Sequence, residues 1–117
     1  MMLVVGAIAS GKKTYVRSLG YCEEDFANAN CEEGRVVYNA QDLVALSESD
    51  DELFEQLAAK DVVICTEVGC GVVPQSSEER AWREQVGRLT CELARRADKV
   101  VRMVCGIPVV LKDVSAR

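Results

Sequence analysis

One pattern near the amino terminus limits the folds open to this chain more than any other. A short apolar run, Leu3–Val5, is typical of a strand buried on both faces. A helix is predicted from Lys12 to Leu19, because Gly20 stands at a helix-terminating position. Between strand and helix, residues 6–12 match GxxxxGK, in which glycines let backbone N–H groups surround a phosphate and the lysine reaches its terminal oxygens. The alternative is a tight turn that carries a lysine by chance.

The motif predicts the phosphate-binding residues but departs from the usual pattern at the metal ligand. A Ser or Thr normally follows the lysine and binds Mg²⁺, whereas Lys13 stands there and Thr14 comes one step later, about 100° further around the helix. An ammonium neutralises phosphate charge but cannot bind a metal, so Thr14 is the hydroxyl left as a candidate metal ligand. The residues expected to bind the phosphate groups of a ligand in this segment are Gly6, Ala7, Ile8, Ala9, Ser10, Gly11, Lys12, Lys13 and Thr14.

A second candidate site residue is Glu67, which follows the clearest apolar strand of the chain, Val62–Cys65. Ligands gather at the carboxyl ends of strands in open α/β sheets, so Glu67 is expected to act in catalysis beside Lys12 by holding Mg²⁺ or a water. The alternative is a loop carboxylate that caps local backbone N–H groups.

The rest of the chain alternates between strand and helix patterns. Ser49 with Glu52, and Ser76 with Glu79, are capping boxes that predict two helix starts. Strands separated by helices imply crossover connections, and therefore a three-layer α/β fold with a mostly parallel sheet of four to five strands, in a single domain spanning residues 1–117. The further strands expected are Val36–Tyr38, Val100–Val104 and Val109–Leu111. A helical turn is expected at Asp42–Leu46, a surface connection at Tyr21–Gly34 and a turn at Gly106–Pro108. The helix after Ser76 is expected to turn one face toward the core, formed by Trp82, Val86, Leu89 and Leu93.

Composition narrows the classes of function. The net charge of −5 repels phosphodiester backbones, which argues against nucleic-acid binding. No apolar run approaches the ~20 residues that span a bilayer, and no secretory signal is recognised, so a cytoplasmic protein is expected. The six cysteines form no CxxC pair and there is no histidine, so we expect reduced thiols that are mostly buried, with a Cys-only metal site as the alternative.

The second half of the chain carries a set of motifs in a fixed order. They are TEVGCGVVP at Thr66–Pro74, a helix with a Gly-Arg pair within Arg83–Leu89, ADKV at Ala97–Val100, and CGIP at Cys105–Pro108 leading to Lys112. In this order, together with the amino-terminal GxxxxGK, they resemble the adenosylcobinamide kinase / adenosylcobinamide-phosphate guanylyltransferase family of cobalamin biosynthesis. The segments that carry this resemblance cover about half of the chain.

The resemblance implies a P-loop NTPase-like, RecA-like fold and phosphorylation of the aminopropanol hydroxyl of adenosylcobinamide by ATP or GTP, followed in the family by GMP transfer through a guanylylated histidine. It also implies that Gly69 and Gly71 form a loop near the substrate, and that Tyr38 and Asn39 lie near the base or ribose. Because this chain has no histidine, guanylyl transfer by that route is not expected. The shortening relative to the family falls between Gly20 and Asp61.

Three classes of function remain open at this point. The first is a kinase acting on cobinamide or another corrinoid alcohol. The second is a regulatory module that binds a nucleotide or corrinoid without chemistry, and the third is a degenerate paralogue retained as an oligomer partner. A small homo-oligomer is expected, with no nucleic-acid or membrane partner.

Overall fold

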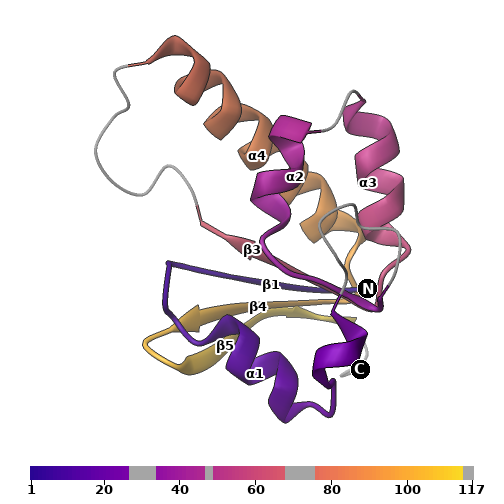
Figure 1. Cartoon of the computed structure of the whole chain (residues 1–117). Coiled ribbons are helices and arrows are strands. Elements are labelled where there is room, and N and C mark those ends of the chain that lie inside the picture. Colours follow the sequence, from indigo (N-terminus) through magenta and orange to yellow (C-terminus); the bar gives the residue numbers. More distant parts are fainter. Residues whose placement is uncertain (27–33, 47–48, 68–75, 115–117) are drawn as a thin grey trace.

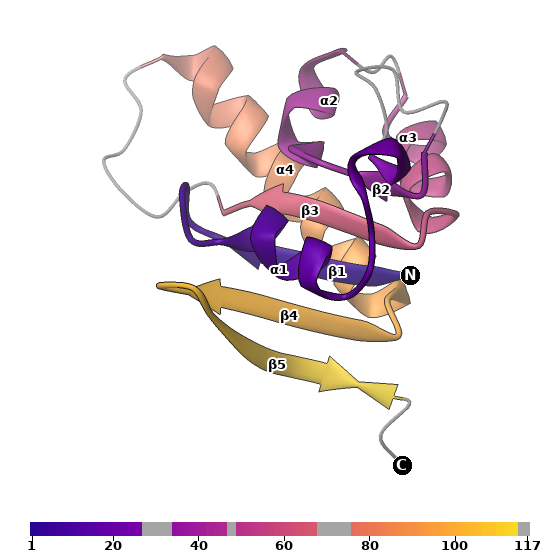
Figure 2. The same cartoon turned by 60° about the horizontal axis from the view of Figure 1, so that its bottom comes forward.

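A computed structural model of the chain describes residues 1–26, 34–46, 49–67 and 76–114. Its centre is a five-stranded sheet with the strand order β2-β3-β1-β4-β5 (Figure 2). Neighbouring strands run parallel from β2 to β4, and β5 is antiparallel to β4. The predicted α/β class with a mostly parallel sheet is therefore confirmed. The strands are β1 (Met2–Gly6), β2 (Val36–Val37), β3 (Val62–Thr66), β4 (Lys99–Val104) and β5 (Ile107–Asp113).

Helices cover both faces of this sheet, as a three-layer arrangement requires. Helix α1 (Lys12–Ser18) lies on one face, and α2 (Ala40–Leu46), α3 (Asp50–Ala58) and α4 (Ser77–Arg96) lie on the other (Figure 1). Within the predicted surface connection, Glu23–Asp25 forms the short 3-10 helix η1, and residues 27–33 lie outside the described part. Among the described residues, no helix is both long and apolar enough to cross a membrane.

The two predicted capping boxes fix the starts of α3 and α4. The Ser49 hydroxyl accepts a hydrogen bond from the Glu52 N–H at 3.4 Å, and the Ser76 hydroxyl accepts one from the Glu79 N–H at 3.2 Å. Each bond satisfies a backbone donor that the first helical turn leaves free. Both predicted helix starts are confirmed.

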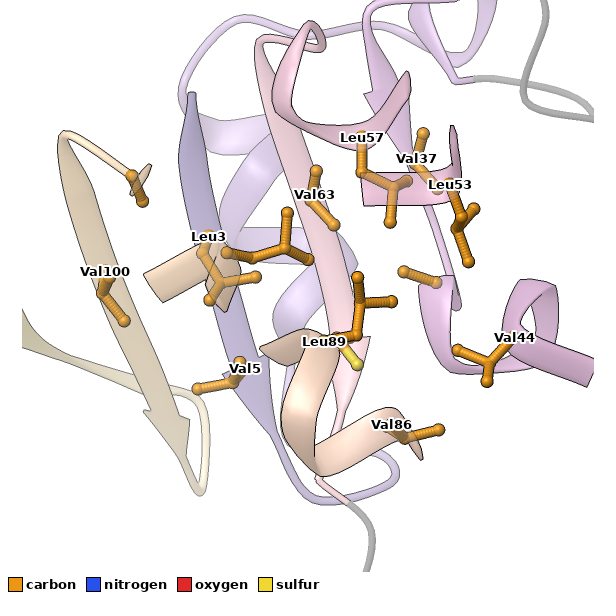
Figure 3. Packing of buried hydrophobic residues seen from close by; sticks show 14 residues of the cluster. Leu3, Val5, Val37, Val44, Leu53, Leu57, Val63, Val86, Leu89 and Val100 are labelled. Carbon is orange, nitrogen blue, oxygen red and sulfur yellow. The ribbon is translucent and has the colours of Figure 1, made fainter. Parts of the chain in front are cut away.

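Alternate residues of the central strands enter two separate cores, because successive side chains of a strand point to opposite faces. Val4 and Ile64 face α1, where Val16 packs against them. The larger core lies on the opposite face of the sheet, against α2, α3 and α4 (Figure 3). It includes the α4 residues predicted to face inward, Val86, Leu89 and Leu93, and Trp82 is partly buried against it. Two covered faces explain the nearly uninterrupted apolar runs of β1 and β3.

The carboxyl-terminal hairpin corrects one sequence prediction. The turn consists of Cys105 and Gly106 alone, and Ile107 and Pro108 already belong to β5, paired with β4. Both turn residues have positive φ, 50° for Cys105 and 78° for Gly106, as a two-residue hairpin of the favoured twist requires. The prediction of a Gly106–Pro108 turn is wrong because cysteine takes a left-handed conformation that its residue type does not favour.

The prediction that the thiols are mostly buried is also wrong for the described part of the chain. Of its four free cysteines, Cys65 is buried, whereas Cys22, Cys91 and Cys105 are exposed. Cys91 lies on α4, and Cys105 lies in the hairpin turn. These two elements present their cysteines to solvent because their apolar sides are formed by other residues.

Candidate functional site

The segment between β1 and α1 forms a compact loop whose conformation depends on left-handed residues. Ala9 has φ 58° and Gly11 has φ 90°, and the Ser10 N–H donates to the Ala7 carbonyl at 3.2 Å. Gly11 is the N-cap of α1 and supplies no side-chain acceptor to the helix. The first turn of α1 therefore keeps N–H groups that can donate hydrogen bonds to an anion.

The hairpin between β4 and β5 supports this loop from below. The Gly106 N–H donates to the Ser10 carbonyl at 3.0 Å. A β-carbon added at Gly6 would lie 2.8 Å from the Met103 carbonyl oxygen, and one added at Gly11 would lie 3.3 Å from the Gly106 α-carbon. The two glycines of the motif therefore allow the loop to lie against β4 and the hairpin.

Lys12 is the one lysine among the buried residues of the described chain. Its residue is 5% exposed, and its ammonium donates to the Ala7 carbonyl at 2.6 Å. Burial lowers the pKa of the Lys12 ammonium from its usual value, and the nearby Cys65 and Glu67 oppose that shift. The ammonium is thus held inside the loop by one carbonyl, in the place from which the motif requires it to reach a phosphate.

Lys12 also lies in the wall of a cavity of about 570 Å³ at the carboxyl edge of the sheet. A cavity of this volume falls within the range that small-molecule sites occupy. Its walls combine one ammonium, one guanidinium, two carboxylates and two aromatic rings, which suits a ligand with both a charged group and a flat apolar part. The lining residues are Ile8, Ala9, Lys12, Tyr38, Asn39, Gln41, Asp42, Thr66, Glu67, Trp82 and Arg83.

Six of the fourteen predicted site residues line this cavity. Ile8, Ala9 and Lys12 come from the loop, and Tyr38 and Asn39 come from the end of β2. Glu67 follows β3 and lines the same space. Gly6, Ala7, Ser10 and Gly11 complete the loop around Lys12 without lining the cavity, and Gly69 and Gly71 lie outside the described residues.

Glu67 is held by an arginine from the other side of β1. Its carboxylate oxygens lie 2.7 Å from Arg102 Nε and 3.2 Å from Arg102 Nη2. The strand register explains the contact, because Val5 pairs with Cys65 on one side and with Arg102 on the other. A bidentate arginine fixes the orientation of a carboxylate.

Lys13 and Thr14 do not line the cavity, and their positions bear on the metal. The Lys13 ammonium lies 3.7 Å from the Glu23 carboxylate and 4.9 Å and 5.1 Å from the ring centroids of Phe26 and Tyr38. Thr14 is exposed on α1. Position 13 offers no hydroxyl to a phosphate-bound Mg²⁺, and the carboxylates that line the cavity are Asp42 and Glu67, the latter bound to Arg102.

Five lining residues were not predicted as site residues: Gln41, Asp42, Thr66, Trp82 and Arg83. Asp42 lies in the first turn of α2, the helix that follows β2, so the rule that ligands gather at the carboxyl ends of strands could have pointed to it. Trp82 and Arg83 had no such signal. Their helix begins far from the loop in sequence, and only the packing of α4 brings them to the cavity.

Comparison with known proteins gives a family and two relatives. The family model described as "Cobinamide kinase / cobinamide phosphate guanyltransferase" matches residues 23–111. Proteins named "Bifunctional adenosylcobalamin biosynthesis protein CobU" from Escherichia coli (strain K12) and Salmonella typhimurium (strain LT2) are each 40% identical over 58 residues. That region is 50% of this chain and 32% of each relative, so the chain spans about a third of the length of these relatives.

Proposed function

This chain belongs to the cobinamide kinase / cobinamide phosphate guanyltransferase family, and from that membership we propose that it binds ATP or GTP and phosphorylates the aminopropanol hydroxyl of a cobinamide. In this proposal the terminal phosphates lie at the loop of residues 6–14, and the alcohol enters the cavity from the side of Tyr38 and Trp82. The single observation that carries it is the buried Lys12, held within a glycine loop at the wall of that cavity.

The proposed chemistry uses this chain's charged groups in separate roles. The Lys12 ammonium exchanges its bond to the Ala7 carbonyl for one to a terminal phosphate oxygen and neutralises charge as the phosphoryl group leaves the nucleotide. The cobinamide oxygen forms the new bond to phosphorus, and the bond from that phosphorus to the leaving nucleoside diphosphate breaks. The hydroxyl proton passes to a cavity carboxylate. Asp42 and Glu67 are the carboxylates that line the cavity, and Arg102 orients the Glu67 carboxylate.

The experiment that tests this function measures binding and turnover separately. Calorimetric titration with ATP and with GTP is expected to give saturable one-site binding, and incubation with cobinamide is expected to release the nucleoside diphosphate. No binding of either nucleotide at millimolar concentration would refute the proposal.

A second candidate function is a nucleotide-binding or corrinoid-binding module without chemistry, or a degenerate paralogue. The observation that favours it is the absence of the metal-ligating hydroxyl at Lys13, together with the bidentate pairing of Glu67 to Arg102. Ligand-induced thermal stabilisation without release of a diphosphate would select this function over the kinase.

The ligand arrangement predicts nucleotide binding that does not depend on a divalent metal. Chelation by EDTA is expected to change the Kd for ATP or GTP by less than about twofold, since Lys12 and backbone N–H groups supply the phosphate contacts. Lys13→Ser provides a hydroxyl at the usual position and is expected to make binding stronger with Mg²⁺ than with EDTA. If the natural protein already loses its nucleotide in EDTA, the metal is held by groups other than those described above. If Lys13→Ser leaves the metal dependence unchanged, Thr14→Val in a metal titration separates a working Thr14 ligand from a site that binds no metal.

The absence of histidine from the sequence predicts that this chain forms no covalent GMP intermediate and does not transfer guanylyl groups. The 117 residues contain no imidazole that could act as the nucleophile. Incubation with radiolabelled GTP, followed by denaturing electrophoresis under alkaline conditions, is expected to show no protein-linked label that acid releases. A labelled band with that acid sensitivity would contradict the prediction.

A further inference from the structure

The sheet is incomplete beside the candidate site, because β2 is much shorter than the strand it pairs with. β2 pairs with β3 only through Val36↔Val62 and Val37↔Val63, whereas β3 continues to Thr66. Asn39 then takes φ 58°, which turns the chain out of the sheet and into α2. Within the part of the chain that the structure describes, the last residues of β3 consequently have no neighbouring strand on this side.

The side chain of Gln41 takes the place of the missing strand. Its Oε1 accepts a hydrogen bond from the Thr66 N–H at 3.0 Å, as a backbone carbonyl of β2 would have done. Its Nε2 donates to the Asn39 Oδ1 at 3.3 Å. A primary amide can serve both ends of this bridge because it carries a donor and an acceptor. Gln41 is 8% exposed, so the bridge is shielded from water.

The backbone of the same residue reaches a third element. The Gln41 carbonyl accepts a hydrogen bond from the Trp82 indole N–H on α4 at 3.1 Å. The residues joined in this way, Asn39, Thr66 and Trp82, all line the cavity together with Gln41 itself. Three walls of the cavity, from the end of β2, the end of β3 and α4, thus meet at one residue.

We propose that Gln41 is a positioning residue that sets the relative placement of these three walls and thereby the affinity of the site. The role in affinity rests on the proposed nucleotide binding, whereas the role in holding the walls does not. Loss of the side-chain amide would free the Thr66 N–H, which precedes Glu67, and release the Asn39 side chain. The α2 backbone, whose Gln41 carbonyl accepts the Trp82 hydrogen bond, would no longer be bonded to β3.

The test uses the single tryptophan of the chain as its reporter. Gln41→Met keeps the side-chain length and removes both the donor and the acceptor of the amide. We expect red-shifted Trp82 emission, stronger quenching by acrylamide, and a Kd for ATP or GTP that is about fivefold higher. Gln56→Met is the matched control, because Gln56 is exposed on α3 and does not line the cavity. It is expected to keep the fluorescence and affinity of the natural protein.

The outcomes separate this inference from the proposed function. If folded Gln41→Met keeps both the Trp82 signal and the affinity, the inference is overturned. If the Trp82 signal changes but the affinity does not, Gln41 is structural and the positioning role is also overturned. If the natural protein binds no nucleotide, the proposed function fails, and the Trp82 signal still decides whether Gln41 holds the walls. Should Gln41→Met not fold, amide exchange in the natural protein decides the bridge: we expect a protected Thr66 N–H, and rapid exchange there would refute it.

Discussion

Lys12→Ala is expected to weaken the binding of ATP or GTP by about tenfold to 100-fold. A hydrogen bond to a charged group contributes about 1.5–3 kcal/mol, and the ammonium is the strongest phosphate contact that the described loop offers. The same substitution also removes a buried ammonium and its hydrogen bond to the Ala7 carbonyl, so stability is measured as well. Calorimetric titration of the natural protein and the variant measures the change in Kd, and thermal unfolding measures stability beside it.

A matched lysine separates this effect from a general change in charge. Lys99 begins β4 at the opposite edge of the sheet, where it pairs in register with Met2, whereas the loop follows Gly6. Lys99→Ala removes the same charge and is expected to leave the Kd within about twofold. If Lys12→Ala also stays within twofold of the natural protein, the loop is not a working phosphate site, and the kinase proposal loses the observation on which it rests.

The parts of the fold and of the candidate site that could be predicted from the sequence depend on residues close together in the chain. The GxxxxGK pattern needs only a strand, a turn and a helix, and Lys12 takes its position from the six residues before it. The starts of α3 and α4 were equally readable, since Ser49 and Ser76 each bond to an N–H three residues later. Local hydrogen bonds of this kind are fixed by spacing along the chain.

The contacts that sequence could not predict join residues that only the sheet register brings together. Arg102 contacts Glu67 across β1, which lies between β3 and β4. No sequence pattern around either residue predicts this contact. Gln41 is similar, because its role follows from the early end of β2, and β2 was predicted one residue too long, through Tyr38. The contacts of Lys13 could not be predicted either, because its ammonium lies near Glu23 and the Phe26 ring, which are outside the motif.

Gly6→Ala is expected to lower the free energy of unfolding by about 2 kcal/mol and to abolish nucleotide binding. The added β-carbon would lie 2.6 Å from the Ser10 hydroxyl and 2.8 Å from the Met103 carbonyl oxygen, both closer than atoms in contact allow. Overpacking in a filled site typically costs about 1–3 kcal/mol. Ser10 can rotate its hydroxyl away, but the Met103 carbonyl belongs to the backbone of β4 and cannot move without disturbing the strand. The loop must therefore shift, and it carries Lys12 with it.

Two further variants identify the Met103 contact as the cause. The buried Ser10 hydroxyl has no hydrogen-bond partner within the described chain, so Ser10→Ala alone should cost little, and adding it to Gly6→Ala should restore only a small part of the loss. Gly87 lies within α4, where an added β-carbon would meet no atom within 4 Å, so Gly87→Ala is expected to stabilise the protein by about 0.5–1 kcal/mol. Chemical denaturation should thus give opposite signs for the same Gly→Ala change at positions 6 and 87. Full recovery of stability and binding in the Gly6→Ala/Ser10→Ala variant would show instead that the serine hydroxyl alone limits the space at Gly6, and that the loop does not depend on its contact with β4.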